Sequence, residues 1–269
     1  RCAARSARAR PLRASHVAGS SPPANRAFGT SAADAARNAA DVRDLLRTRL
    51  SLTDAEVDRM VRHRPLGALA TVAPKLVWPQ RRLGLDEAQL KKVVLLNPSL
   101  LSKSIEDNLA PTLDWLQARL DLDDEQLRKM IVALPALLGY SVEDNVEPKL
   151  QWLQRRLDLD EAQLRKIVRL DPSLLNKSVE ENLEPKLYFF ERELLRGSRA
   201  ELRDWVVKKS PCLSYSLTNR YRPRLEACRA AGVDAKRVLS YATQTDEYFC
   251  ERVGMTLGEF EAIRESVSV

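Results

Sequence analysis

The side chains best suited to binding chemistry in this chain are cations that recur at a fixed spacing. The first row follows a recurring proline and consists of Lys75, Thr112, Lys149, Lys186 and Arg224. The second row lies seven residues further along and consists of Arg82, Arg119, Arg156 and Glu193. Seven residues are almost two turns of an α-helix, so both rows share one face. Such cations neutralise phosphates and release counterions, which predicts a surface that binds nucleic acid.

Aromatic residues occupy a register between these rows, at Trp78, Trp115, Trp152 and Phe189. Planar rings can stack on unpaired bases, but rings at a fixed register of a repeat protein also pack between successive units. Acidic residues neighbour the cations throughout, so a solvated surface of ion pairs is the alternative to phosphate binding. The same alternative applies to three basic pairs on another helix of each unit, Lys91 and Lys92, Arg128 and Lys129, and Arg165 and Lys166.

Basic residues are least balanced by acidic ones between Arg196 and Arg229, where the net charge is +6. The aromatic residues Trp205, Tyr215 and Tyr221 lie within this segment. An unbalanced basic segment predicts contact with phosphate, and the acidic surface of a partner protein is the alternative. The residues that we expect to make this contact are Lys208, Lys209, Arg220, Arg222, Arg224 and Arg229.

These residues recur because the chain itself repeats every 37 residues. Three near-identical copies begin at Leu83, Leu120 and Leu157, and divergent copies begin at Leu52 and Ser198. One unit of this length cannot bury its own apolar face, so successive units must stack. The sequence therefore predicts an all-α fold, a right- or left-handed superhelical solenoid of about six helical repeats. Residues 233–269 are expected to form a partial repeat or a C-terminal cap.

Each unit carries signals for two helices. An acidic cluster that includes Asp160 favours a helix start, and Pro172 ends that helix, which we call helix A. A capping pattern then begins helix B, with Ser178 and Glu181 in the third central copy. Ser104 with Asp107 and Ser141 with Asp144 repeat this pattern in the other two copies. A proline lies seven residues into helix B, at positions 111, 148 and 185, where it either kinks the helix or restarts it.

The order of leucines and prolines resembles that of a known family. Leu170, Pro172 and the pair Leu174-Leu175 are followed by the run Leu183-Glu184-Pro185-Lys186-Leu187. This pattern resembles the repeat of the mitochondrial transcription termination factor (mTERF) family, and the likeness covers about residues 52–232. The resemblance implies a curved superhelix of helical triplets that is located in mitochondria or plastids. It also implies that nucleic acid binds along a concave groove.

The N-terminal segment has a different composition. Residues 1–33 hold six of the 44 Lys and Arg residues and no acidic residue, which leaves 38 Lys and Arg against 37 Asp and Glu in the rest. This composition predicts an organelle transit peptide, with a disordered basic tail as the alternative. Residues 26–31 resemble a mitochondrial processing site, so we expect the mitochondrial matrix, with the chloroplast as the alternative. Residues 34–51 are expected to form a linker or an N-terminal cap helix.

Residues suited to catalysis or metal binding are scarce. The histidines are His16 and His63, and the cysteines Cys2, Cys212, Cys228 and Cys250 form no CxxC pair. We therefore expect no metal site, no Cys/His nucleophile and no cofactor. The sequence has no glycine-rich phosphate loop and no apolar run of membrane-spanning length, so neither nucleotide hydrolysis nor a membrane span is expected.

These observations predict a non-catalytic nucleic-acid-binding protein of organellar gene expression. Its target is either double-stranded DNA, for a regulator of transcription or its termination, or structured RNA, for a factor in rRNA binding and ribosome assembly. Ribosomal or transcription proteins are the expected protein partners, and we expect a monomer. The alternative function is a helical-repeat scaffold or a structural subunit of an organellar assembly such as the ribosome.

Overall fold

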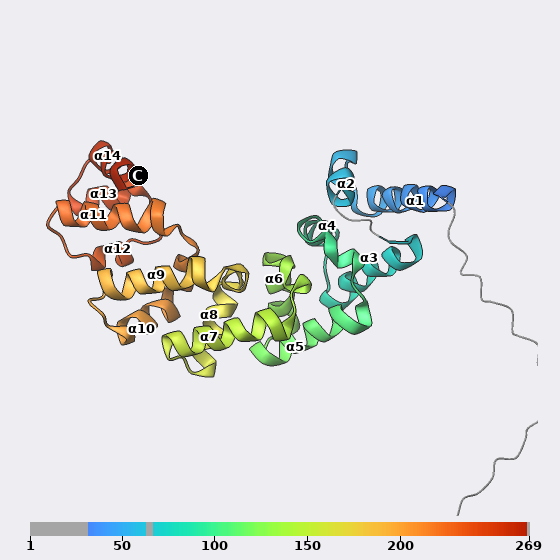
Figure 1. The fold of residues 1–269 in the computed structure, drawn as a ribbon, viewed down its shortest axis with the longest axis horizontal. Helices are drawn as coiled ribbons and strands as arrows, with labels where there is room; N and C mark the ends of the chain where they lie inside the picture. The colour runs from blue at the N-terminus through green and yellow to red at the C-terminus, as the bar shows by residue number, and fades with distance from the viewer. Residues whose placement is uncertain (1–31, 63–66, 268–269) are drawn as a thin grey trace, which may run out of the picture.

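The computed structural model describes residues 32–62 and 67–267, and every regular element in those ranges is helical. The helices stack into an elongated arc (Figure 1). It runs from α1 (Ala32–Leu50) at one end to α14 (Leu257–Val267) at the other. The all-α solenoid predicted from the sequence is confirmed.

Two helices and a short connection form each unit. The A helices are α2 (Asp54–Val61), α4 (Glu87–Leu96), α6 (Asp124–Ala133), α8 (Glu161–Leu170) and α10 (Arg199–Lys209). The B helices are α3 (Leu69–Leu83), α5 (Ala110–Leu120), α7 (Glu147–Leu157), α9 (Glu184–Phe189) and α11 (Arg222–Ala230). Short 3₁₀ helices connect A to B, at η1 (Pro98–Ser102), η3 (Pro135–Gly139), η5 (Pro172–Asn176) and η8 (Ser210–Ser214).

The A helices begin and end where the sequence predicts. The Asp160 side chain accepts a hydrogen bond from the Gln163 N–H, and the Gln163 side chain accepts one from the Asp160 N–H. The same reciprocal cap opens α4 at Asp86 and α6 at Asp123. This cap satisfies N–H groups that have no partner within the helix. Pro172 then begins the 3₁₀ helix, because the residue before a proline leaves helical geometry.

The B helices accommodate their proline by a wider turn. Ser104 caps the helix by accepting from the Asp107 N–H, but its own N–H donates to Asn108, so the expected reciprocal bond from residue 107 is not made. Residues Ile105–Leu109 form a π turn, and Pro111 follows at the start of α5. A π turn bonds each N–H to the carbonyl five residues back, which relieves the clash between a proline ring and the fourth carbonyl. The chain therefore stays helical from the π turn into α5. Pro111 lies in the first turn of α5, which is the position expected if the proline restarts the helix.

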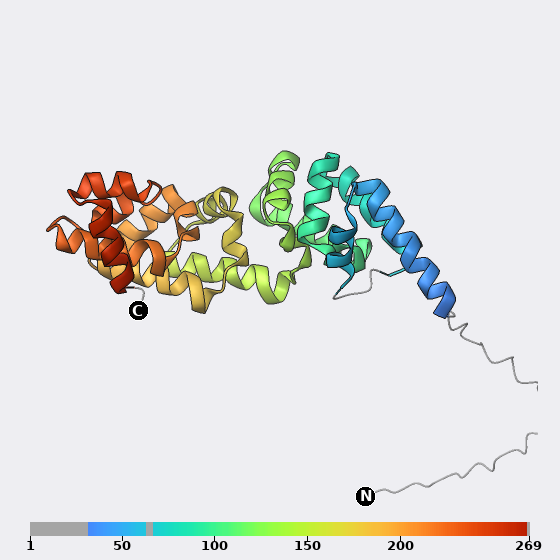
Figure 2. The same ribbon diagram turned by 90° about the horizontal axis from the view of Figure 1, so that it is seen from above.

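A single leucine-rich core runs the length of the arc, since each unit buries its apolar face on its neighbours. In Figure 1, α4 and α6 lie on the inner side of the arc and α5 and α7 on the outer side. The view from above shows the two rows of helices turning about the long axis (Figure 2). At the C-terminal end, α12 (Lys236–Ser240), α13 (Asp246–Val253) and α14 cover α11. The expected leader and its processing site lie almost entirely outside the described residues.

Candidate nucleic-acid interface

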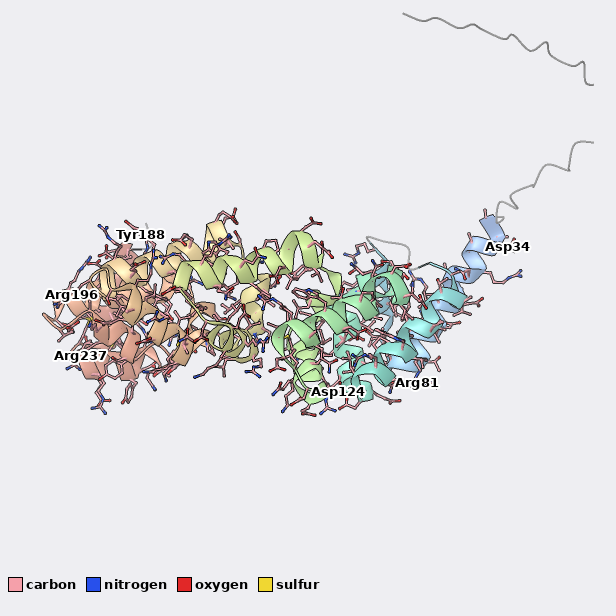
Figure 3. The ribbon with its side chains drawn as sticks, turned by 90° about the horizontal axis from the view of Figure 1, so that it is seen from below. Asp34, Arg81, Asp124, Tyr188, Arg196 and Arg237 are labelled. Carbon is pink, nitrogen blue, oxygen red and sulfur yellow. The ribbon has the colours of Figure 1, made fainter. Side chains whose placement is uncertain are left out.

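Charged side chains cover the surface of the arc (Figure 3), but the first row of cations points inward. The Lys75 ammonium donates to the Leu101 carbonyl at 2.9 Å, and Lys149 donates to Leu175 at 2.7 Å. Lys186 donates to Leu213 at 2.8 Å and also to Asn182 Oδ1. Each acceptor lies in the 3₁₀ helix of the following unit. These lysines therefore link one unit to the next.

Burial changes the ionisation of these ammonium groups. Lys186 is only 4% exposed, and burial, with a smaller effect from the charge of Lys177, lowers its pKa to about 8. Burial also lowers the pKa of Lys149. A side chain this enclosed cannot neutralise a phosphate at the surface, so the nucleic-acid prediction is wrong for Lys186. Lys75 and Lys149 are half-buried, and their ammonium groups already bond to the neighbouring unit.

Arg224, at the end of the first row, is fully buried. Its guanidinium donates to the Tyr241 and Gln244 carbonyls, at 2.7 Å each, and pairs with Asp246 at 2.7 Å. It also lies 4.8 Å from the centre of the Phe249 ring. These contacts fasten the C-terminal helices to α11, so the prediction that Arg224 binds nucleic acid is also wrong.

The second row forms ion pairs between successive B helices. Arg119 on α5 pairs with Glu147 on α7 at 2.9 Å, and its guanidinium also reaches Glu161. Arg156 on α7 pairs with Glu184 at 2.9 Å and with Glu191 at 2.8 Å. The structure thus matches the ion-pair alternative for these two arginines.

Arg82 behaves in the same way, since it pairs with Asp114 at 2.9 Å. Phosphate binding by any of these arginines would require that such pairs break. The aromatic residues between the rows also match the packing alternative. Trp78, Trp115 and Trp152 are partly buried against the core, and Phe189 is buried.

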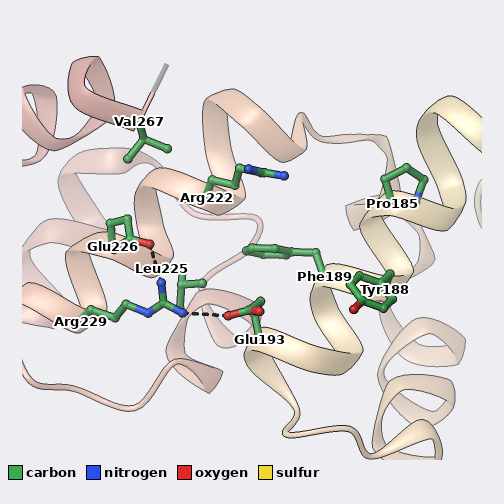
Figure 4. A pocket seen from close by; sticks show the side chains of 9 residues that line it. All are labelled: Pro185, Tyr188, Phe189, Glu193, Arg222, Leu225, Glu226, Arg229 and Val267. Atoms are coloured by element: carbon green, nitrogen blue, oxygen red, sulfur yellow. Dashed lines mark hydrogen bonds and ion pairs between the residues drawn. The ribbon is translucent and has the colours of Figure 1, made fainter. Parts of the chain in front are cut away.

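The contact between η7 (Phe190–Leu194), which continues α9, and α11 reverses the charges of this row. Glu193 stands at the register of Arg156, while Arg222 and Arg229 stand at the registers of Glu184 and Glu191. Glu193 pairs with Arg229 at 2.8 Å, and Arg229 also pairs with Glu226 (Figure 4). Arg222 is exposed beside this group, and no described residue pairs with it.

The remaining cations of the basic C-terminal segment differ in whether they bond to other residues of the protein. Arg220 donates to the Ala242 carbonyl at 3.0 Å and lies 4.5 Å from the centre of the Tyr215 ring. Lys208 and Lys209, at the end of α10, are exposed. Within the described part of the chain, neither lysine makes an ion pair or a side-chain hydrogen bond. They are the best-placed members of the predicted set.

The A helices hold further exposed cations, in the three basic pairs for which the sequence left an ion-paired surface as the alternative. In each basic pair, the first residue bonds to its own or another unit: Lys91 donates to the Ser51 carbonyl at 2.8 Å, and Arg165 pairs with Asp121 at 3.4 Å. The second residue points outward. The helical phase contains the signal for this difference, because Leu164 and Val168 fix the buried face and place residue 166 opposite it.

We name the resulting outward set the A-helix cation row. Its members are Arg59, Lys92, Lys129, Lys166, Arg169, Lys208 and Lys209, all of them exposed. Lys129 pairs with Glu125 on its own helix, and no ion pair of the other six is found among the described residues. Leu96 and Leu170 lie on the same helices and are 61% and 50% exposed. In Figure 1, α4 and α6, which carry Lys92 and Lys129, lie on the inner side of the arc, whereas α10, which carries Lys208 and Lys209, lies below α9.

A comparison with protein families places this solenoid. The sequence model of the mTERF family matches residues 68–249. The chain belongs to the mTERF family. No curated protein matches the chain of this mTERF protein.

Other kinds of site find little support in the described part of this mTERF protein. No three residues of the types His, Cys, Asp and Glu come together there in a group that could hold a metal ion. Cys212, Cys228 and Cys250 are buried and unpaired, and burial raises the pKa of the Cys228 thiol to about 11. His63 lies outside the described residues. None of the described helices is both long and apolar enough to cross a bilayer.

Proposed function

We propose that this mTERF protein binds nucleic acid without catalysis in mitochondrial gene expression, with its A-helix cation row on the phosphate backbone. One observation carries the proposal: exposed cations recur on successive A helices, and among the described residues only Lys129 of this row forms an ion pair, with Glu125 on its own helix. Family membership supports an organellar nucleic-acid-binding role. A plastid location is the alternative to the mitochondrion.

The chemistry of the row suits a backbone contact. Lys92, Lys129 and Lys166 occupy one register of three stacked helices, so their ammonium groups follow the solenoid as phosphates follow a strand. Lys208 and Lys209 extend this row on α10. Phosphate contacts fix position and register but carry no sequence information, so the row predicts affinity rather than specificity. Transcriptional regulation on double-stranded DNA and rRNA binding in ribosome assembly are both open to such a surface.

The test measures the salt dependence of binding. Each lost phosphate contact should flatten the log–log salt slope by about 0.9 on duplex DNA. We expect Lys166→Ala combined with Lys208→Ala to reduce the slope by about two. The matched control is Arg81→Ala combined with Arg155→Ala, which removes the same charge from exposed residues of the B helices (Arg81 is labelled in Figure 3). Equal slopes for the two double variants would refute the assignment of the row.

Crosslinking in the organelle then decides between the two targets. DNA and RNA libraries made from one pull-down would show enrichment at discrete DNA positions or on ribosomal RNA. Recovery of neither, with stable co-purifying proteins instead, would favour an interaction scaffold. The exposed Leu96 and Leu170 favour this second candidate, because exposed apolar side chains can form the centre of a protein–protein interface. Binding through such an interface should depend little on salt.

A further inference from the structure

The first row has one position where its lysine is missing. Thr112 stands at the register of Lys75 and Lys149, and its side chain is too short to reach the next unit. The carbonyl at the acceptor register is that of Leu138, which corresponds to Leu101 and Leu175. Within residues 32–62 and 67–267, no hydrogen bond to the Leu138 carbonyl is found. The acceptor is therefore present without the ammonium group that its counterparts bind.

A second acceptor of this arrangement is also retained. The Lys186 ammonium lies between the Leu213 carbonyl and Asn182 Oδ1, with a distance of 2.8 Å to each. Asn108 occupies the register of Asn182 in the unit that carries Thr112. The unit thus keeps both oxygen types that hold a lysine elsewhere in the molecule, and Asn108 Oδ1 also accepts a hydrogen bond from the Ser104 N–H at 3.2 Å.

A cavity of about 480 Å³ lies beside this place, and Thr112, Asn108 and Gly139, the residue after Leu138, are among the residues that line it. Trp115 and Tyr140 contribute aromatic walls, and Asp107 and Glu143 contribute carboxylates. Neither carboxylate takes part in an ion pair with a described residue.

One cation already lies in this cavity. Lys103 lines it, and its ammonium donates to the Gly139 carbonyl at 3.0 Å, one residue beyond Leu138. Two carboxylates against this single ammonium leave the lining with an excess of negative charge. That excess favours an additional cation over an anion.

The carboxylates belong to a longer acidic edge at the starts of the B helices. Its members are Glu106, Asp107, Glu143, Asp144, Glu180 and Glu181, all exposed and none in an ion pair within the described ranges. This edge lies on the B helices, whereas the A-helix cation row lies on the A helices. It repels phosphate, so a nucleic acid on the cation row leaves the acidic edge free for a basic partner.

We propose that the Thr112 cavity binds a lysine side chain of a basic partner polypeptide. The partner's ammonium takes the place that Lys149 and Lys186 fill in their own units, and it donates to the Leu138 carbonyl. Neighbouring basic residues of the partner pair with the acidic edge. The cavity supplies specificity for an alkylammonium group, and the edge supplies attraction at longer range.

The test uses a fluorescein-labelled peptide with four lysines separated by glycines, and binding is followed by fluorescence anisotropy. Thr112→Lys fills the cavity with the protein's own ammonium, and we expect peptide binding to weaken by about tenfold, the lower end for one lost charge-assisted hydrogen bond. Ala88→Lys is the matched control, because it adds the same charge at an exposed position of α4. It should change affinity less than twofold. Equal affinities for the two variants would overturn the proposal, since the acidic edge alone would then explain binding.

Further measurements check this result independently. Glu143→Gln removes one carboxylate of the cavity without filling it and should also weaken binding, whereas unchanged affinity would count against the site. The same peptide with acetylated lysines should not bind, because acetylation removes the ammonium charge.

Thr112→Lys should leave nucleic-acid binding unchanged, and the Lys166 and Lys208 double variant should leave peptide binding unchanged. Failure of one surface is thereby distinguishable from failure of the other.

Discussion

The contacts between B helices differ between the central repeats and the C-terminal end. In the centre, Arg156 is bonded to two carboxylates of the next unit, on α9 and on η7, and its side chain is only 12% exposed. At the last contact the charges are reversed, and Glu193 faces the two arginines Arg222 and Arg229. One carboxylate satisfies one of these arginines, and Arg222 is left exposed. Where the register is regular, the arginine therefore pairs with carboxylates of the next unit. Where the register is broken, Arg222 stays exposed and has no ion-pair partner among the described residues.

The same rule separates structural from available cations elsewhere. Lys149 and Lys186 bond to carbonyls of the next unit because those carbonyls recur at the same period as the lysines. Lys166 shares that period, but it is exposed, and its ammonium bonds to no described residue. A recurring cation is thus evidence for ligand binding only when its internal partner does not recur with it.

Replacing the two arginines that flank Pro223 should give the largest contrast. Arg224→Ala leaves Asp246 and two carbonyls without their buried partner, and we expect a loss of about 3–5 kcal/mol in the free energy of unfolding. Arg222→Ala removes an exposed side chain and should cost less than about 0.5 kcal/mol. Urea unfolding monitored by circular dichroism measures both. Similar midpoints for the two variants would contradict the assignment of Arg224 to the core.

Lys186 should make stability rise with pH. Its pKa in the folded protein is lowered to about 8, below the ordinary lysine value, so the unfolded chain binds more protons between these two pKa values. Stability should therefore increase from about pH 8 to pH 10.5, by an amount on the order of 2–3 kcal/mol. Lys186→Met removes the titrating group and should flatten this part of the stability curve. Parallel stability curves for the two proteins between pH 7 and 10.5 would show that burial does not lower the pKa of Lys186.

Local signals predicted most of the fold, and longer-range geometry decided the site. Asp160 and Pro172 act within a few residues of themselves, so capping and proline chemistry were sufficient to place the A helices. The pairing of Arg119 with Glu147 depends on how the units stack. Residues 28 apart meet only at one superhelical twist, and no local rule fixes that twist. The outward direction of Lys166 was predictable from helical phase, but charge counts alone gave both members of each basic pair equal weight.

The central and terminal contacts should also differ when one arginine is removed from each. Arg156→Ala leaves Glu184 and Glu191 without their shared partner in a half-buried setting, and we expect a loss of about 1–2 kcal/mol. Arg222→Ala serves again as the control, because it removes the same side chain at a position where no described residue forms an ion pair with it. A double-mutant cycle with Glu184→Gln assigns the coupling to that pair. A coupling near zero would mean that the recurring ion pairs do not stabilise the stack.

The smallest expected effect on stability concerns the residue with positive φ that follows each B helix. In the central repeats this residue is an aspartate that forms an ion pair, whereas in an earlier unit it is Gly84. Asp121 has φ of 53° and pairs with Arg165, and Asp158 has φ of 54° and pairs with Arg203. Gly84 holds the same register with φ of 63°, and Arg128 lies 3.6 Å from where a Cβ would stand. Gly84→Ala should cost about 1 kcal/mol through backbone strain alone.

Gly84→Asp introduces the same strain but supplies a carboxylate near Arg128, and aspartate tolerates the left-handed region better than alanine. We therefore expect it to recover about half of the alanine loss, which thermal unfolding of the two variants can resolve. Adding Arg128→Ala should abolish the difference between Asp and Ala if the ion pair causes it. A difference that persists in that background would instead assign it to the backbone preference of aspartate.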